Sequence, residues 1–147
     1  MKYSFIVPVF NRPDEVDELL ESLCHQEVKD FEVIIVEDGS KKPCKDVCDK
    51  YADILDLHYY YKENSGPGQS RNYGAERAKG EWLIVLDSDV VLPNGYLSSV
   101  ECRVQSVEFA TAADSALTSW GGSKLYVLHS KLDEYEVFIH SSCLQSS

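Results

Sequence analysis

Short apolar runs alternate with segments of helical spacing over the first hundred residues. Residues 3–10 are almost continuously apolar and β-rich, which is typical of a strand buried on both faces. Pro13 then opens a segment with acidic residues in its first turn. Its apolar side chains recur at i, i+3, i+4 and i+7, as on a helix that packs against a sheet: Val16, Leu19, Leu20 and Leu23.

The same alternation continues to about residue 100. It predicts strands at residues 31–36, 57–61 and 82–86, a short helix bearing Cys44, Val47, Cys48 and Tyr51, a helix at 69–79 and another beginning near 93. Strands and helices in this order form right-handed βαβ units. The fold class is therefore α/β, with a mostly parallel sheet flanked by helices.

The pattern changes after about residue 100. Residues 101–147 contain no proline, are rich in serine and lose the strand–helix rhythm. A weak helix at 104–117 and a hairpin of 124–129 with 135–140 are the expected elements there. We therefore divide the chain into residues 1–100, an ordered α/β unit, and a divergent tail at 101–147, so that the fold is incomplete on its C-terminal side.

Polar side chains follow each predicted strand at the point where the strand ends. They are Asn11, Asp38, Asn64, Asp87 and Asp89. The carboxyl ends of parallel strands share one edge, and ligands of such sheets bind outside that edge. Packing alone gives no reason for this convergence, so the pattern predicts a site there.

Asp87-Ser88-Asp89 directly follows the apolar run at residues 82–86. Two carboxylates one residue apart at the end of a buried strand suit Mg²⁺ or Mn²⁺, and Mg²⁺ commonly takes one or two protein carboxylates plus substrate phosphates. The alternative is a pair of solvated loop acids, which is the commoner meaning of an isolated D-x-D pattern.

Other strand ends carry groups with two possible roles. Asp38 can accept hydrogen bonds from a planar base or a ribose, or it can form an Asx turn or a helix cap. Arg71 and Asn72 follow the turn Gly66-Pro67-Gly68, where a helix N-terminus suits a diphosphate. Arg71 can instead pair with Glu76 at the surface. Phe10 can stack on a base or fill the core.

Composition narrows the classes of ligand. The 147 residues are 44% hydrophobic and carry a net charge of −11, which indicates a globular protein and argues against nucleic acid and anionic membranes as partners. There is no signal peptide or membrane span in the sequence, so we expect a cytoplasmic protein. Five cysteines lack the paired spacing of a zinc site and are expected to be reduced thiols.

Four blocks, at residues 5–12, 30–40, 64–74 and 86–89, resemble the family 2 glycosyltransferases of GT-A (Rossmann-like) fold in order, spacing and content. The resemblance implies transfer of a sugar, with inversion, from a nucleotide-diphospho-sugar, usually a UDP-sugar, to a saccharide or lipid-linked acceptor. It also implies Mg²⁺ or Mn²⁺ as cofactor. The implied nucleotide-sugar-binding residues are Pro8, Val9, Phe10, Asn11, Glu37, Asp38, Asn64, Arg71, Asn72, Asp87 and Ser88.

Within that set the resemblance implies individual roles. Asp38 holds the uracil, Arg71 reaches the nucleotide, and Asp89, with Asp87, binds the metal. Glu37 stands where the family commonly has aspartate, which is a mild departure because the charge is kept.

The tail departs further from the family pattern. No carboxylate in it has the context of a general base, so the base is not identified, and we expect the chain to be truncated or altered after about residue 100. The alternative is therefore a catalytically inactive nucleotide-sugar-binding module without an acceptor site. A sugar-phosphate nucleotidyltransferase is disfavoured, because Asn11-Arg12-Pro13-Asp14 is not the Gly-rich basic loop that it needs.

Overall fold

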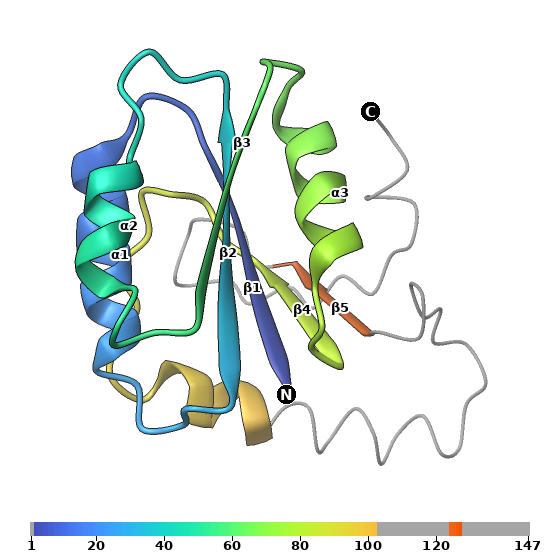
Figure 1. The fold of residues 1–147 in the computed structure, drawn as a ribbon. Helices are drawn as coiled ribbons and strands as arrows, with labels where there is room; N and C mark the ends of the chain where they lie inside the picture. Colours follow the sequence, from blue (N-terminus) through green and yellow to red (C-terminus); the bar gives the residue numbers. More distant parts are fainter. Residues whose placement is uncertain (1, 103–123, 128–147) are drawn as a thin grey trace.

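The computed structural model describes residues 2–102 and 124–127. In this part of the chain, five parallel strands form one sheet in the order β3-β2-β1-β4-β5. Helices cover both faces: α1 and α2 lie on one face and α3 on the other (Figure 1). The strand order reverses between β1 and β4, as in doubly wound nucleotide-binding sheets.

The elements follow the predicted alternation. Their bounds are β1 Tyr3–Val9, α1 Pro13–Cys24, β2 Phe31–Asp38, α2 Lys45–Tyr51, β3 Leu57–Lys62, α3 Pro67–Arg77, β4 Trp82–Val85 and β5 Lys124–Val127. Residues 96–102 are also helical. The predicted α/β fold with a parallel sheet is thereby confirmed.

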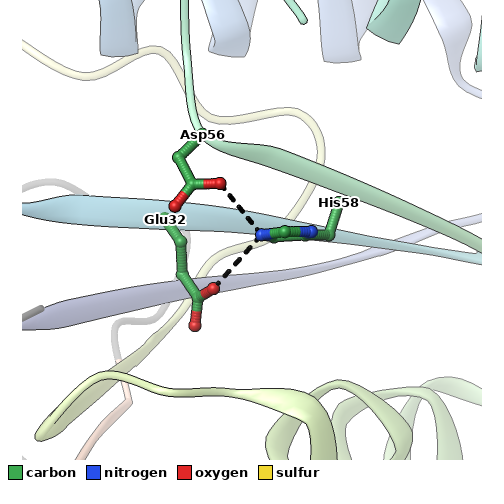
Figure 2. A group of neighbouring side chains, drawn as sticks. All are labelled: Glu32, Asp56 and His58. Carbon is green, nitrogen blue, oxygen red and sulfur yellow. Dashed lines mark ion pairs between the residues drawn. The ribbon is translucent and has the colours of Figure 1, made fainter.

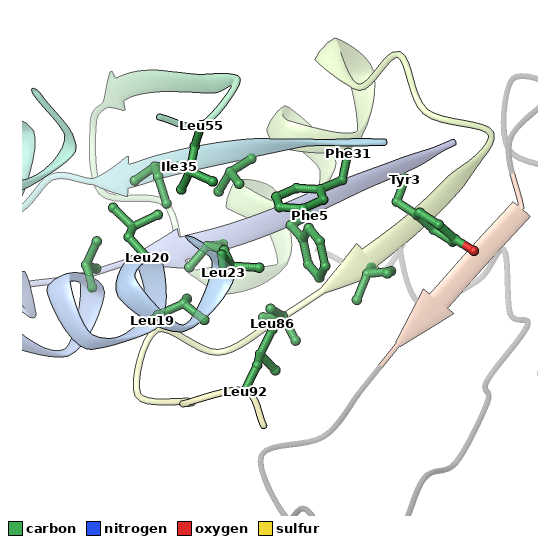
Figure 3. Packing of buried hydrophobic residues seen from close by; sticks show 14 of the residues in the cluster. Tyr3, Phe5, Leu19, Leu20, Leu23, Phe31, Ile35, Leu55, Leu86 and Leu92 are labelled. Carbon is green, nitrogen blue, oxygen red and sulfur yellow. The ribbon is translucent and has the colours of Figure 1, made fainter. Parts of the chain in front are cut away.

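The main hydrophobic core lies between the sheet and α1 (Figure 3). Its strand side includes Phe5 and Phe31, whose rings meet edge to face with centroids 5.3 Å apart. Leu19, Leu20 and Leu23 supply the helix side and are fully buried. The helical spacing seen in the sequence is therefore the face that α1 presents to the sheet.

The opposite face of the sheet packs against α3 through small residues. A Cβ atom on Gly74 would lie 2.6 Å from Ile6 Cγ2 and 3.3 Å from Val36 Cγ2. This helix can therefore sit close to β1 and β2 only because residue 74 has no side chain. The close approach fixes the position of the N-terminus of α3 relative to the strand ends.

Several boundaries differ from the sequence expectation by one or two residues, and those of α3 and β2 bear on the site. Helix α3 begins at Pro67 and ends at Arg77, two residues earlier than predicted at each end. Strand β2 continues through Glu37 and Asp38, because β3 pairs with it there, Glu37 with Tyr61 and Asp38 with Lys62.

Residues 124–127 form the strand β5, which pairs in parallel with β4. The expected hairpin partner at 135–140 and the expected helix at 104–117 lie outside the described residues. The division of the chain at residue 100 stays a prediction.

Candidate active site

A cleft of about 590 Å³ opens at the carboxyl edge of the sheet. Its volume is in the range of small-molecule sites. The described residues that line it are Pro8, Val9, Phe10, Arg12, Asp38, Asn64, Gly66, Pro67, Arg71, Asp87, Ser88 and Asp89. They come from the ends of β1 to β4 and from the start of α3, so the cleft lies where the strand order reverses.

The structure thus brings together most of the residues that the sequence singled out. Three of them are not among the lining residues: Asn11, Glu37 and Asn72. Phe10, in contrast, is not a core residue, because 51% of its surface is exposed beside the cleft. An aromatic ring in that position is available for stacking.

Asp38 is held in the cleft by three donors. Its Oδ1 accepts from Lys62 Nζ at 2.7 Å and from the Ser65 backbone N–H at 2.9 Å, and its Oδ2 accepts from the Gly66 N–H at 3.0 Å. Burial alone raises the pKa of Asp38, but these hydrogen bonds outweigh it, so the pKa lies below its usual value. The carboxylate is therefore ionised and fixed, with lone pairs left on Oδ2 for a ligand.

Asp87 and Asp89 have no such partners. Neither carboxylate forms a hydrogen bond or an ion pair within residues 2–102 and 124–127, although both line the cleft. Neighbouring acids without a compensating cation repel one another. Their placement favours a cation as the missing partner.

Arg71 faces the same cleft from the first turns of α3. Its Nε is buried and finds no acceptor among the described residues. Gly66, with φ of 98°, caps this helix and Pro67 begins it, so that the positive end of the helix dipole is directed at the cleft. An anion placed there would meet both the guanidinium and the free backbone N–H groups of the first turn.

Glu37 is held by hydrogen bonds within the protein and does not line the cleft. It is fully buried, its Oε1 accepts from Ser40 Oγ at 2.5 Å, and its Oε2 accepts from Cys44 N at 2.8 Å and from Tyr59 Oη at 2.9 Å. The Cys44 thiol is a further donor at 3.1 Å. With its oxygens taken by protein donors, Glu37 anchors the segment between β2 and α2 and offers nothing to the cleft.

Asn11 and Asn72 also lie outside the lining. Asn11 has a left-handed φ of 54°, and its Oδ1 accepts from the N–H groups of Lys41 and Lys42 at 2.7 and 3.0 Å. It therefore ties the loop after β1 to the loop after β2. Asn72 Oδ1 is buried, with no hydrogen-bond donor among the described residues.

Some residues that line the cleft or hold its side chains in place were not predicted from the sequence. Arg12 lines the cleft from within a block that carried the family resemblance, and Gly66 and Pro67 line it from the turn that the sequence had linked only to a helix N-terminus. Lys62 is 12% exposed at its side chain and holds Asp38. No sequence signal pointed to Lys62, because its role depends on the register of β3 against β2.

The donor set at the cleft suits a divalent metal ion. Asp87 and Asp89 provide carboxylate oxygens, which Mg²⁺ and Mn²⁺ prefer, and both are without protein partners in the described part of the chain. Two protein carboxylates leave positions for phosphate oxygens of a substrate. The acids Asp114, Asp133, Glu134 and Glu136 lie outside the described residues, so the structure does not place them relative to the cleft.

The strand order and the cleft at its reversal define a Rossmann-like α/β protein that takes its ligand at the carboxyl edge of the sheet. The chain belongs to glycosyl transferase family 2, whose family model matches residues 4–139. That match continues beyond residue 100, where the strand–helix rhythm of the sequence is lost.

Named relatives agree with this assignment. The chain is 34% identical over 102 residues to a GalNAc(5)-diNAcBac-PP-undecaprenol beta-1,3-glucosyltransferase of Campylobacter jejuni, covering 67% of this chain and 33% of that protein. It is 38% identical over 93 residues to the poly(ribitol-phosphate) beta-N-acetylglucosaminyltransferase TarS of Staphylococcus aureus, covering 60% of this chain and 16% of TarS. Both of these relatives are glycosyltransferases.

Solved structures show the same GT-A fold. TarS residues 1–349 in complex with UDP-GlcNAc superpose with a TM-score of 0.68 at 34% identity, covering 72% of this chain and 32% of that one. The chain thus spans about a third or less of the relatives that it matches. Among residues 2–102 and 124–127, no helix combines the length and the apolar character needed to cross a membrane.

Proposed function

We propose that the cleft binds a UDP-sugar together with Mg²⁺ or Mn²⁺, and that the chain is the donor-binding part of an inverting glycosyltransferase. The proposal rests on one observation, that acidic and basic side chains without protein partners line the same cleft. Asp87 and Asp89 lack cationic partners and Arg71 Nε lacks an acceptor within the described residues. A metal-bound diphosphate supplies what each of them lacks.

The other lining residues fit the nucleoside end of such a donor. Asp38 is ionised and rigid, and a free lone pair on it can accept the N–H of uracil. Phe10 is exposed beside the cleft and can stack on the base. The likeness to TarS, which has been crystallised with UDP and with UDP-GlcNAc, supports a uridine nucleotide.

The proposed reaction is a single displacement. The oxygen of an acceptor hydroxyl forms a bond to the anomeric carbon as the bond from that carbon to the phosphate oxygen breaks, and the hydroxyl proton passes to a general base. The nucleoside diphosphate leaves carrying the electron pair of the broken bond. Bound at Asp87 and Asp89, the divalent ion supplies Lewis-acid neutralisation of that leaving group. Arg71 and the N-terminus of α3 hold the diphosphate in place.

Calorimetric titration with UDP tests the binding step. UDP should bind in the presence of Mn²⁺, and a chelator or the Asp89→Ala substitution should remove the metal-dependent part. Asp53→Ala, a change at an exposed acid outside the cleft, serves as the matched control and should leave binding unchanged. UDP binding that is equally tight in chelator would disprove the metal assignment.

The alternative function is nucleotide-sugar binding without transfer. It is favoured by one observation, that the described residues lining the cleft all lie between Pro8 and Asp89, the part of the chain to which we assign donor binding. A screen of UDP-sugars for release of UDP, with and without saccharide or lipid-linked acceptors, separates the two. Release of UDP that depends on Asp89 supports transfer or donor hydrolysis, whereas binding with no release supports the binding module.

A further inference from the structure

A second group of metal-ligating side chains lies at the opposite, amino edge of the sheet. We call Glu32, Asp56 and His58 the amino-edge cluster. His58 Nε2 lies 3.0 Å from Asp56 Oδ1 and 3.4 Å from Glu32 Oε2, and the three side chains converge on one point (Figure 2). Glu32 is the second residue of β2, Asp56 directly precedes β3, and His58 is the second residue of β3.

Backbone pairing brings the three residues together. The Val33 N–H donates to the Asp56 carbonyl at 2.8 Å, and Ile34 pairs with His58 across β2 and β3. Side chains alternate along a strand, so Glu32, two residues before Ile34, points to the same face of the sheet as His58. Six residues at about 3.3 Å each separate Glu32 from Asp38, which puts the cluster about 20 Å from the cleft.

Glu32 is buried and held in position by fixed donors. Its side chain is 1% exposed, and its Oε1 accepts from Ser4 Oγ at 2.6 Å and from the Lys79 N–H at 2.7 Å. Ser4 Oγ in turn accepts from the Gly80 N–H at 2.8 Å. This arrangement orients the carboxylate and leaves Oε2 directed at His58, as outer-shell hydrogen bonds orient the ligands of metal sites.

A proton on His58 cannot serve both carboxylates equally well. The Nε2 atom carries a single hydrogen, which can be aligned with one oxygen at a time. A metal ion about 2.0–2.2 Å from each ligand in tetrahedral geometry separates the ligand atoms by about 3.3 Å. The observed N···O separations of 3.0 and 3.4 Å are close to this value, and all three ligand atoms lie within 4.8 Å of one another.

We propose that the amino-edge cluster is a zinc site. One neutral imidazole and two carboxylates balance the charge of a divalent ion, and the imidazole ligand favours Zn²⁺ over Mg²⁺ or Ca²⁺. Asp56 and His58 are 48% and 36% exposed at their side chains, so that the ion can enter from solvent and water can complete the coordination. Bound zinc would join the edge strand β3 to β2.

The test is a zinc titration of the chelator-stripped, thiol-reduced chain in the absence of nucleotide. Zinc should bind, and His58→Ala and Asp56→Asn should each weaken binding at least about tenfold, because removing a ligand costs no less than removing an outer-shell partner. His25→Ala and Asp53→Ala, at exposed positions outside the cluster, are the matched controls.

X-ray absorption of the zinc-bound chain gives a readout that folding defects do not mimic. A first shell of nitrogen and oxygen, with the imidazole signal lost in His58→Ala, supports the site. Asp56→Asn changes a half-exposed side chain and keeps the test valid if His58→Ala folds poorly. Sulfur in the first shell, unchanged affinity in both cluster variants, or no zinc binding would each overturn the proposal.

Discussion

Lys62 and Asp38 are register partners at the ends of β3 and β2, and Lys62 Nζ lies 2.7 Å from Asp38 Oδ1. The two side chains are only 12% and 7% exposed, so the pair is shielded from solvent. Lys62 also contacts Ser65 Oγ and the Glu63 carbonyl. The pair thus joins the sheet to the loop that leads into α3, and the wall of the cleft depends on it.

Removing this lysine should destabilise the fold. Lys62→Met keeps the aliphatic stem and deletes the charge, which leaves Asp38 with only its two backbone donors. We expect a loss of about 1.5–3 kcal/mol in the free energy of unfolding, as for hydrogen bonds to charged groups. Urea denaturation measures it, with Lys41→Met at an exposed position as the control. Equal stability of the two variants would contradict the structural role of the pair.

Acid should lower the free energy of unfolding by protonating Asp38. Its pKa is lowered in the folded state, so its contribution to stability is present above the unfolded-chain pKa of about 3.9 and is lost as the pH falls through the lower, folded pKa. Asp38→Asn should therefore flatten the acid limb of stability against pH. Urea midpoints between pH 7 and pH 2.5 test this. Curves that run parallel for the two proteins would show that Asp38 is not responsible.

Gly74→Ala should destabilise the protein, although the same change in an exposed helix stabilises by about 1 kcal/mol. The new methyl group would lie 2.6 Å from Ile6 Cγ2 and push α3 away from β1. We expect a loss of about 1–3 kcal/mol from overpacking. Gly95→Ala is the matched control, because a Cβ there meets nothing within 4 Å. A thermal melt in which both variants behave alike would refute the close packing.

Glu37→Gln tests whether residue 37 is structural. An amide offers one acceptor oxygen where the carboxylate offers two, so that its nitrogen would face a protein donor at Oε1 or Oε2. We expect a loss of about 1–3 kcal/mol, measured by urea denaturation, against no change for Glu27→Gln at an exposed position. Tyr59→Phe should cost about 1 kcal/mol by removing a single donor. Full stability of Glu37→Gln would rule out the anchoring role.

Much of the site was predictable because strand ends can be located from the sequence. The apolar runs at β1, β2, β3 and β4 determine where each strand stops, and parallel pairing brings those ends to one edge. Asp38, Asn64, Asp87 and Asp89 were expected together on this ground, and the structure brings them to one cleft.

Neighbouring positions in the chain nevertheless have different roles. Glu37 and Asp38 point to opposite faces of β2, so one is enclosed by Ser40, Cys44 and Tyr59 while the other faces the cleft. The sequence shows two adjacent acids and does not show which partners surround each of them. Asn11 likewise has the expected position at a strand end, but its side chain accepts from the backbone of the neighbouring loop.

The sequence by itself determined the order of elements, the parallel sheet, the family and the D-x-D at the end of β4, because these depend on local periodicity and short motifs. Only the tertiary structure decided that Lys62 meets Asp38, that Glu37 is enclosed, and that Glu32, Asp56 and His58 converge at the amino edge. These contacts join residues far apart in the chain. They depend on the register of β3 against β2, and a one-residue shift would send every side chain of β3 to the other face.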